Sequence, residues 1–516
     1  MLNRRIFLLN SLLAGAGLLF SSFKKWAWEN FNSLPFRILL GRATTKSITI
    51  RILPKADIRL FISYEAGKTN TSIKTSPVEA LKNNPVDIVL DNLSPGQEYF
   101  YQVFYQVDPG ADFTASPACR FRTGRAKKEP FVFTVTADSH LGTLKHCDPA
   151  LYQLTLDNAA ANKPDLHFSL GDDFRASRVN EPDYEKIEQL YLNQLDHLGS
   201  FCHSTPFYFI LGNHELEAKA FDDGTENCLA AWSARARKKF IPNPLPNDFY
   251  SGNTTQAVTE KGRQNYYAFE WGDVLFVAMD VFWYSNISAA DEEMREQNKQ
   301  ANEGLSREEK QQLREERQKA KEEGRQNKNP GDKQKHKDQW NFTIGEAQYQ
   351  WLAQTLEKSR TRYKFVMGHH VLGSCRGGVE WAGTFEWGGK NRREIDEFTG
   401  NRPGWKAPIH QLFVKNNVTA FIQGHDHLFV RQDLDGISYI TCPMSGDPGY
   451  NTYNSDHYLS GDKLSNTGHL KFTVNSDDVT LEYIKAVLPK DEAIQGVNGH
   501  IAYAWSFANR TRTDKS

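Results

Sequence analysis

Short clusters of aspartate, asparagine, histidine and glycine recur along this 516-residue chain. The segment at 421–430 reads FIQGHDHLFV and places two histidines one residue apart, directly after an apolar run and a glycine. The other clusters are DSH at 138–140, GDD at 171–173, GNHE at 212–215 and GHH at 368–370. Oxygen and nitrogen ligands of this kind, without clustered cysteines, suit zinc, manganese, iron or nickel rather than an iron–sulfur cluster.

The number of these ligands bears on the chemistry. A single zinc ion needs about four ligands, so the set is large enough for two ions. Two ions about 3.5 to 4 Å apart clamp the attacking and leaving oxygens of a phosphoryl displacement. The pattern therefore indicates two-metal hydrolysis.

The clusters follow near-continuous apolar runs, which are typical of strands buried on both faces. The six runs are FVFTVTAD at 131–138, DLHFSLGDD at 165–173, FYFILGNHE at 207–215, DVLFVAMD at 273–280, YKFVMGHH at 363–370 and VTAFIQGHDH at 418–427. Helix-like stretches at 149–161, 184–198 and 346–359 lie between them. This alternation predicts a layered α/β domain.

Five of the six runs end in one of the polar clusters. Because open α/β sheets bind ligands at the carboxyl ends of their strands, these side chains are expected to converge. A single buried histidine is usually a core residue with one hydrogen bond, but five coincidences at one sheet edge need another explanation. The converging residues are Asp138, His140, Asp172, Asn213, His214, His369, His370, His425 and His427.

Two other hydrolase motifs are excluded, because one required residue is missing from each. His214 and Glu215 begin an H-E-x-x-H metalloprotease pattern, but Ala218 occupies the second histidine position. The run GSCRG at 373–377 has Cys375 where a serine elbow needs serine. Cys375 is therefore expected to be structural.

The five motifs, in their order, resemble those of calcineurin-like metallophosphoesterases over roughly 131–448. The resemblance implies that Asp138, His140 and His427 hold one ion, that Asp172 bridges, and that Asn213, His369 and His425 hold the other. The cofactor is expected to be two divalent or trivalent ions such as zinc, iron or manganese. Such ions lower the pKa of a shared water, so that hydroxide attacks phosphorus near neutral pH.

The resemblance also implies residues for catalysis and substrate binding. His214 is expected to contact the phosphate and protonate the leaving oxygen, with Glu215 orienting or charging its imidazole, unless Glu215 is a surface carboxylate. Asn213, His214 and Arg175 form the predicted substrate-binding set. Arg175 stands where purple acid phosphatases have tyrosine, and His140 has no counterpart there, so a ferric-tyrosinate centre is not expected. Arg175 either binds a phosphate oxygen or forms a structural salt bridge, and His370 either touches substrate or packs beside the site.

The N-terminal part of the chain has a different pattern. Residues 36–124 contain alternating and β-branched runs with turn residues between them, which predicts an all-β sandwich. This region resembles a fibronectin type III-like module, and its position resembles that in purple acid phosphatases and some exported alkaline phosphatases. The catalytic domain is expected at 130–490, with a C-terminal tail at 491–516.

Two further segments differ in composition from the rest of the chain. Residues 289–340 form a highly charged insertion that either flanks the active-site mouth or is a tolerated surface insertion. Residues 1–30 contain paired arginines followed by an apolar stretch, typical of an export signal or an uncleaved anchor. An exported, periplasmic or extracellular protein is therefore predicted, with membrane anchoring left open.

Charge and cysteine content limit the partners. The 62 Lys and Arg residues nearly cancel the 63 Asp and Glu residues, so the charge gives no indication of nucleic-acid binding. The six cysteines show no C-x-x-C pair, and their pairing is open. The predicted substrate is a small-molecule phosphomonoester. The alternatives are a phosphodiesterase of the same family and a non-catalytic protein that binds metal or phosphate.

Overall fold

The structure is a computed structural model. It describes residues 31–67, 72–143, 145–176, 183–254, 263–285, 339–371 and 376–507. The predicted export signal, nearly all of the charged insertion, and Cys375 lie outside the described residues. The five cysteines within them are buried free thiols. No helix in the described ranges is long and apolar enough to cross a membrane.

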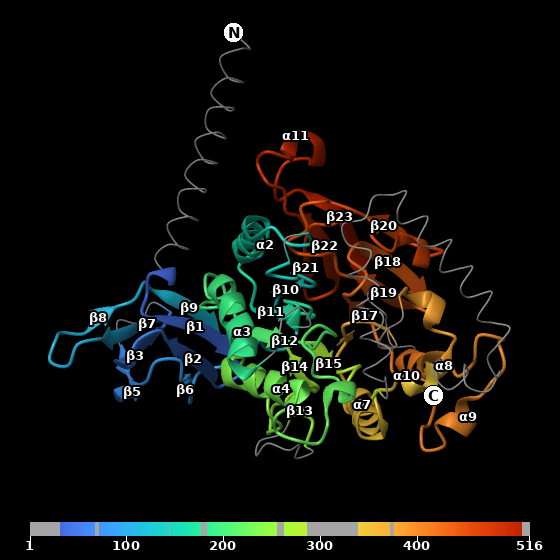
Figure 1. The fold of residues 1–516 in the computed structure, drawn as a ribbon, viewed down its shortest axis with the longest axis horizontal. Coiled ribbons are helices and arrows are strands. Elements are labelled where there is room, and N and C mark those ends of the chain that lie inside the picture. The colour runs from blue at the N-terminus through green and yellow to red at the C-terminus, as the bar shows by residue number, and fades with distance from the viewer. Residues whose placement is uncertain are drawn as a thin grey trace, which may run out of the picture.

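Residues 36–122 form the predicted β-sandwich, drawn in blue at the left of Figure 1. One sheet contains β1 (Phe36–Gly41), β2 (Ile48–Pro54) and β6 (Val86–Leu90). The other contains β3 (Ile58–Ala66), β4 (Ile73–Lys74), β5 (Val78–Ala80), β7 (Glu98–Gln106), β8 (Thr114–Ala115) and β9 (Cys119–Arg122). Alternate residues of β7 are buried, as expected for a strand with one face on the core. The all-β prediction is confirmed.

The catalytic domain contains two large sheets. The six-stranded sheet has the order β12 (Phe207–Phe209), β11 (Leu166–Ser169), β10 (Phe131–Thr136), β21 (Gly468–Val474), β22 (Val479–Lys485), β23 (Ile501–Phe507). The eight-stranded sheet has the order β13 (Ser251–Gly252), β14 (Tyr267–Trp271), β15 (Val274–Ala278), β16 (Tyr363–Met367), β17 (Ala420–Gln423), β19 (Ile437–Thr441), β18 (Phe429–Leu434), β20 (Asp462–Leu464). Strands β10, β11 and β12 are parallel, as are β15, β16, β17 and β19.

Helices cover the outer faces of both sheets, which gives four layers (Figure 1). Helices α2 (Pro149–Ala161), α3 (Tyr184–Leu198) and α4 (Leu229–Phe240) pack on the six-stranded sheet. Helices α7 (Glu346–Lys358), α8 (Phe385–Gly388), α9 (Phe398–Asn401) and α10 (Ile409–Lys415) lie on the other side. Short 3-10 turns span Lys219–Phe221, Gln339–Asn341, Val379–Trp381 and Ser455–His457. The layered α/β prediction is confirmed.

Phenylalanine side chains fill the space between the sheets. The ring of Phe133 lies 4.4 Å from that of Phe472 and 5.0 Å from that of Phe276, measured between centroids. Both faces of the central strands are thus buried, which explains why their sequences are continuous apolar runs.

Local interactions determine where the helices begin. The Asp148 carboxylate accepts the N–H groups of Ala150 and Leu151, and Pro149 occupies the first position of α2.

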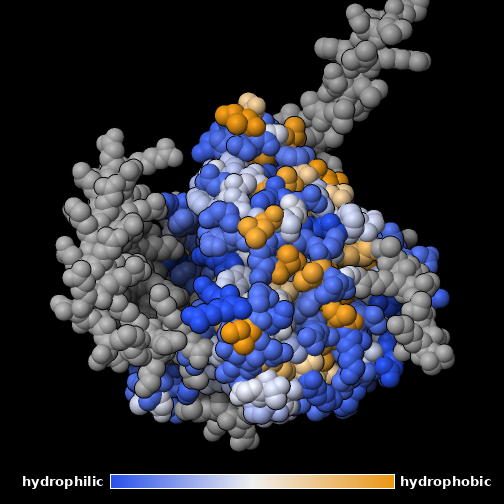
Figure 2. All heavy atoms as spheres, turned by 90° about the vertical axis from the view of Figure 1, so that its right-hand side faces the viewer, coloured by the Kyte–Doolittle hydropathy of each residue, from blue (hydrophilic) through white to orange (hydrophobic). Residues whose placement is uncertain are grey.

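The C-terminal segment differs from the tail expected at 491–516. It contains α11 (Glu492–Gln495) and β23, which pairs with β22 along the edge of the six-stranded sheet. The catalytic domain therefore extends to Phe507. The face that includes this edge is mainly hydrophilic, with separate small apolar patches (Figure 2), as is normal for a protein surface.

The sandwich packs against the α/β domain through apolar contacts, in which Leu39 and Leu53 join the cluster under α3 and α4, and through polar contacts. Arg37 donates to the carboxylate of Asp196 on α3 at 2.6 and 2.9 Å. The Tyr101 hydroxyl donates to the main-chain oxygen of His203 at 2.6 Å. These contacts involve the side of the domain that carries α3, and none of the predicted metal ligands takes part in them.

Candidate metal centre

The five predicted motifs lie in loops that directly follow strands. The DSH, GDD and GNHE loops follow β10, β11 and β12 of one sheet, whereas the GHH and GHDH loops follow β16 and β17 of the other. All of these strands present their carboxyl ends to this region, so the edges of both sheets contribute side chains. The motifs converge as expected, but at the edges of two sheets, so the expectation of a single sheet edge was wrong.

One ligand cluster contains Asp138, His140 and His427, whose ligand atoms all lie within 4.8 Å of one another. The Nε2 atoms of His140 and His427 are 3.0 Å apart. Asp138 Oδ1 lies 3.4 Å from the His427 Nε2 atom and 3.8 Å from that of His140. Two imidazole lone pairs this close repel each other unless a proton or a metal ion lies between them.

A second cluster contains Asp172, His369 and His425. Asp172 Oδ2 lies 3.1 Å from His369 Nε2. Asp172 also forms a cluster with His140 and His214, so its carboxylate touches both halves of the centre, as a bridging ligand must. Asn213 lies on the adjoining loop, and its buried Oδ1 accepts no hydrogen bond from the described residues.

The backbone of these loops is unusual. Five of the predicted ligands have left-handed φ angles: Asp138 at 52°, His140 at 47°, Asp172 at 54°, His425 at 71° and His427 at 61°. Residues with a Cβ rarely adopt this conformation, which costs on the order of 1–3 kcal/mol each and clusters at functional sites. In the GHDH turn the left-handed residues are therefore the two histidines, and Gly424 is not one of them.

The glycines serve a different purpose, which is close approach between loops. A Cβ on Gly424 would lie 2.6 Å from Asp138 Oδ2, and one on Gly212 would lie 2.3 Å from Asp172 Oδ1. Each of these carboxylate oxygens accepts a main-chain N–H from a neighbouring motif, from His425 in the first case and His214 in the second, both at 2.8 Å. One oxygen of each aspartate therefore fixes a loop while the other faces the imidazoles.

Hydrogen bonding also orients His369. Its Nδ1 lies 2.8 Å from the main-chain oxygen of Leu170 and must donate to it, which leaves Nε2 toward the carboxylates. Burial lowers the pKa of this imidazole, but Asp172 and Asp138 outweigh that effect and raise it to about 10. Without another cation, the ring takes a proton to neutralise these carboxylates.

The other buried imidazoles are held neutral. Burial, followed by the charges of neighbouring histidines, lowers the pKa of His140 and His425 well below the ordinary value. Neutral imidazoles are the form that binds metal. Together with Asp138 Oδ1 and Asn213 Oδ1, which are buried and accept no hydrogen bond from the described residues, this donor set fits a pair of ions.

Glu215 is completely buried, so the alternative that it is a surface carboxylate is wrong. Its carboxylate accepts the main-chain N–H groups of Asp172 at 3.0 Å, Asp173 at 2.9 Å and Gly212 at 2.8 Å. It thereby ties the GDD loop to the GNHE loop. A catalytic role toward His214 stays a prediction.

The predicted substrate-binding residues lie beside the first cluster. The His214 side chain is 14% exposed, with Nε2 3.9 Å from Asp172 Oδ2 and its ring 5.3 Å from that of His140. Arg175 is buried, and its charge contributes to the low pKa of His140 after the larger effects of burial and of His427. His370 is buried, with its ring 4.0 Å from that of His425, so it packs beside the site in this structure.

Three residues near the centre were not singled out in the sequence. The ring of His146 lies 6.2 Å from those of both His140 and His427, and Tyr453 lies 6.2 Å from His427. Arg376 bonds to the GHDH turn. None of them belongs to a motif, although Arg376 follows the GHH loop closely enough to have been suspected.

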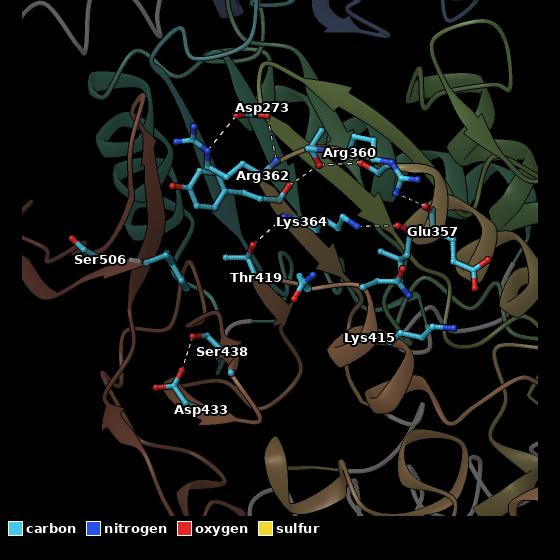
Figure 3. A pocket seen from close by; sticks show the side chains of 18 of the residues that line it. Asp273, Glu357, Arg360, Arg362, Lys364, Lys415, Thr419, Asp433, Ser438 and Ser506 are labelled. Atoms are coloured by element: carbon cyan, nitrogen blue, oxygen red, sulfur yellow. Dashed lines mark hydrogen bonds and ion pairs between the residues drawn. The ribbon is translucent and has the colours of Figure 1, made fainter. Parts of the chain in front are cut away.

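A separate cavity lies away from this centre. It has a volume of about 1190 Å³ and is lined by the amino ends of β16 and β17, the β18–β19 hairpin and β23 (Figure 3). This is the sheet edge opposite the metal centre, and none of the predicted ligands lines it. Arg362 is paired there with Asp273 at 3.5 Å, and Lys364 Nζ donates to the main-chain oxygen of Leu356 at 2.8 Å. The cavity is thus separate from the proposed chemistry.

Comparison with known proteins agrees with the geometry. Residues 131–429 match the calcineurin-like phosphoesterase family, and the chain belongs to this family. No curated protein sequence matches the chain.

The structure of PhoD has the same fold, with a TM-score of 0.59 at 14% identity over 93% of this chain and 91% of that one. A dimetal phosphatase from Danio rerio aligns with a TM-score of 0.36 at 12% identity, over 74% of this chain and 100% of that one. GAP50, the anchor in the inner membrane complex of Plasmodium, gives 0.35 at 11%, over 74% and 90%.

Proposed function

We propose that this chain is an exported phosphatase that hydrolyses small-molecule phosphate monoesters with two bound metal ions. The observation that carries the proposal is the pair of ligand clusters joined at Asp172. Membership of the calcineurin-like phosphoesterase family supports hydrolysis of a phosphoric ester. Export rests on the N-terminal sequence alone.

The proposed division of the ligands follows the motifs. Asp138, His140 and His427 would hold one ion, and Asn213, His369 and His425 the other. Asp172 would be shared. When bound, two such ions supply the Lewis acidity that acidifies a water and stabilises charge on phosphoryl oxygens.

The residues of the chain have complementary tasks. His214 is partly exposed, its Nε2 lies 3.9 Å from Asp172 Oδ2, and its proposed task is to protonate the leaving oxygen. Arg175 adds a buried positive charge on the same side. A dianionic monoester gains more from such charge than a monoanionic diester, which is why we propose the monoester.

The test combines metal analysis with hydrolysis of an aryl phosphomonoester and a bis-aryl phosphodiester. We expect about two ions per chain, faster monoester hydrolysis, and loss of activity in His427→Ala. The control is His457→Ala, since His457 is exposed and outside the ligand clusters. A diester rate above the monoester rate would refute the substrate assignment, and absence of bound metal after reconstitution would refute the centre itself.

Export has a separate test. Residues 1–40 fused to a reporter that is active only outside the cytoplasm should direct its export, and Arg4→Lys with Arg5→Lys should reduce it. A reporter that stays in the cytoplasm would refute this part of the proposal without affecting the enzymatic part.

A further inference from the structure

Arg376 lies against the turn that carries two of the predicted ligands. Its Nη1 donates to the main-chain oxygen of His425 at 2.8 Å and to the carboxylate of Asp426 at 2.9 Å. The Asp426 side chain is 1% exposed, whereas that of Arg376 is 29% exposed. The guanidinium is therefore anchored on its inner side and reaches solvent on the other.

A chain of hydrogen bonds fixes this anchor. The second oxygen of Asp426 accepts the Gly377 N–H at 2.8 Å and the Tyr458 hydroxyl at 2.7 Å. Tyr458 is bonded in turn to Thr441 at 2.8 Å and to Gln423 at 3.2 Å. A guanidinium held by such a network loses little conformational freedom when it binds a ligand.

Most of the donors of Arg376 are still available. Nη1 makes both of its side-chain hydrogen bonds, and within the described residues Nε and Nη2 make none. Two adjacent N–H groups of a guanidinium match the spacing of two phosphate oxygens. If Arg376 only neutralised the charge of Asp426, it would not need its Nε and Nη2 donors.

The position complements that of Arg175. The charge of Arg175 acts on His140 of the first cluster, whereas Arg376 bonds to the backbone of His425 in the second. The two cations thus act on residues of different ligand clusters.

We propose that Arg376 binds the non-bridging oxygens of a terminal, dianionic phosphate group on the His425 side of the centre, and that Asp426 is its positioning residue. This inference rests on the proposed phosphoester hydrolysis and extends it to a determinant of substrate charge. Arg376 favours monoesters and inorganic phosphate over diesters, because a terminal phosphate has an additional charged oxygen to offer.

The experiment must distinguish the role of Arg376 in phosphate binding from its role as the ion-pair partner of Asp426. Arg376→Met alone leaves a buried carboxylate without its cation and is expected to destabilise the fold. The double variant Arg376→Met with Asp426→Asn removes both charges together. Arg360→Met is the matched control, because Arg360 is an exposed arginine at the opposite edge of the sheet.

Each variant is loaded with metal and checked for metal content and unfolding midpoint. Inorganic phosphate is then titrated by calorimetry and as a competitive inhibitor, alongside kcat/KM for monoester and diester. For the double variant we expect phosphate affinity and monoester kcat/KM to fall about 10- to 100-fold, the loss typical of a charged hydrogen bond. The diester kcat/KM should fall less, and Arg360→Met should match the wild type.

A double variant that keeps its metals and binds phosphate like the wild type would overturn the inference, leaving Arg376 as a structural partner of Asp426. Equal losses for monoester and diester would overturn the charge selectivity. If the metal-loaded wild type hydrolyses neither ester, the proposed function fails. The calorimetric comparison would still decide whether Arg376 binds phosphate.

Discussion

Replacing Glu215 with glutamine tests whether its carboxylate fixes the ligand loops, a role that the GNHE motif did not indicate. The carboxylate accepts three main-chain N–H groups, from Asp172 and Gly212 on Oε2 and from Asp173 on Oε1. Glutamine keeps one acceptor oxygen, which can serve the first two donors. Its amide nitrogen must then face the N–H of Asp173, so that two donors point at each other.

The cost follows from that geometry. A buried donor without an acceptor costs about 1–3 kcal/mol, and hydrogen bonds to a charged acceptor are worth about 1.5–3 kcal/mol each. Glu215→Gln should therefore lower the free energy of unfolding by about 2–4 kcal/mol. Glu215→Ala leaves all three donors unpaired, at about 3–9 kcal/mol, which approaches the total stability of many proteins. Glutamine is thus the informative substitution.

The assay is denaturant unfolding of the metal-free protein, with metal content and kcat measured on reconstituted samples. Because Glu215 joins the loops that carry Asp172 and Asn213, we expect lower stability and weaker metal retention together. Glu394→Gln, a change at an exposed carboxylate, should alter neither. A Glu215→Gln protein with wild-type stability and metal content but reduced kcat would refute this reasoning and support the predicted catalytic role.

Three other perturbations have defined outcomes. Asp172→Asn should reduce occupancy of both metal positions, whereas Asp138→Asn should affect mainly one, as measured by metal analysis after dialysis; equal losses would contradict a shared Asp172. Gly424→Ala, whose Cβ would lie 2.6 Å from Asp138 Oδ2, should lower metal content and activity at least tenfold, and unchanged activity would show that the loops can separate. Burial lowers the pKa of His167 to about 3, below its ordinary 6.5, so the unfolded chain takes up the proton first as pH falls. Stability should drop by about 2 kcal/mol between pH 7 and pH 5 for this group, and denaturant unfolding of His167→Gln should show a correspondingly smaller drop.

The fold could be predicted well because its signals are local. The predicted helices at 149–161 and 184–198 coincide with α2 and α3, since caps and apolar spacing mark their ends. Every apolar run contains a strand, although these strands are divided between two sheets. The ligands were found for a related reason: within each sheet the parallel strands bring their carboxyl ends to one edge, so residues distant in sequence can be placed without coordinates.

The features that could not be predicted from the sequence depend on contacts between loops. The letters of GNHE place Glu215 next to a histidine but do not show that its carboxylate turns away toward the GDD loop. Arg376 lies 49 residues before His425 and meets it only because β16 and β17 are neighbours. The strand β23 was assigned to the tail although six of its seven residues (IAYAWSF) are apolar or aromatic, because its pairing with β22 is a tertiary contact that the sequence does not show.

The strain in the ligand loops indicates how the centre is built. Five left-handed residues at about 1–3 kcal/mol each would unfold these turns unless other contacts fixed them. Those contacts are present within the chain: Asp138 holds the N–H of His425, Asp172 holds that of His214, and Glu215 holds three more. The GHDH, GDD and GNHE loops are thus fixed by acidic side chains of other loops, and the DSH loop is fixed by the N–H groups of Asp138 and His140, which donate to the main-chain oxygens of Gly171 and Asp172. These contacts place the ligand atoms before any ion binds. The carboxylates that complete this network also concentrate negative charge around His369. The carboxylates that stabilise the turns therefore also attract cations. Metal binding and the geometry of the loops depend on the same side chains.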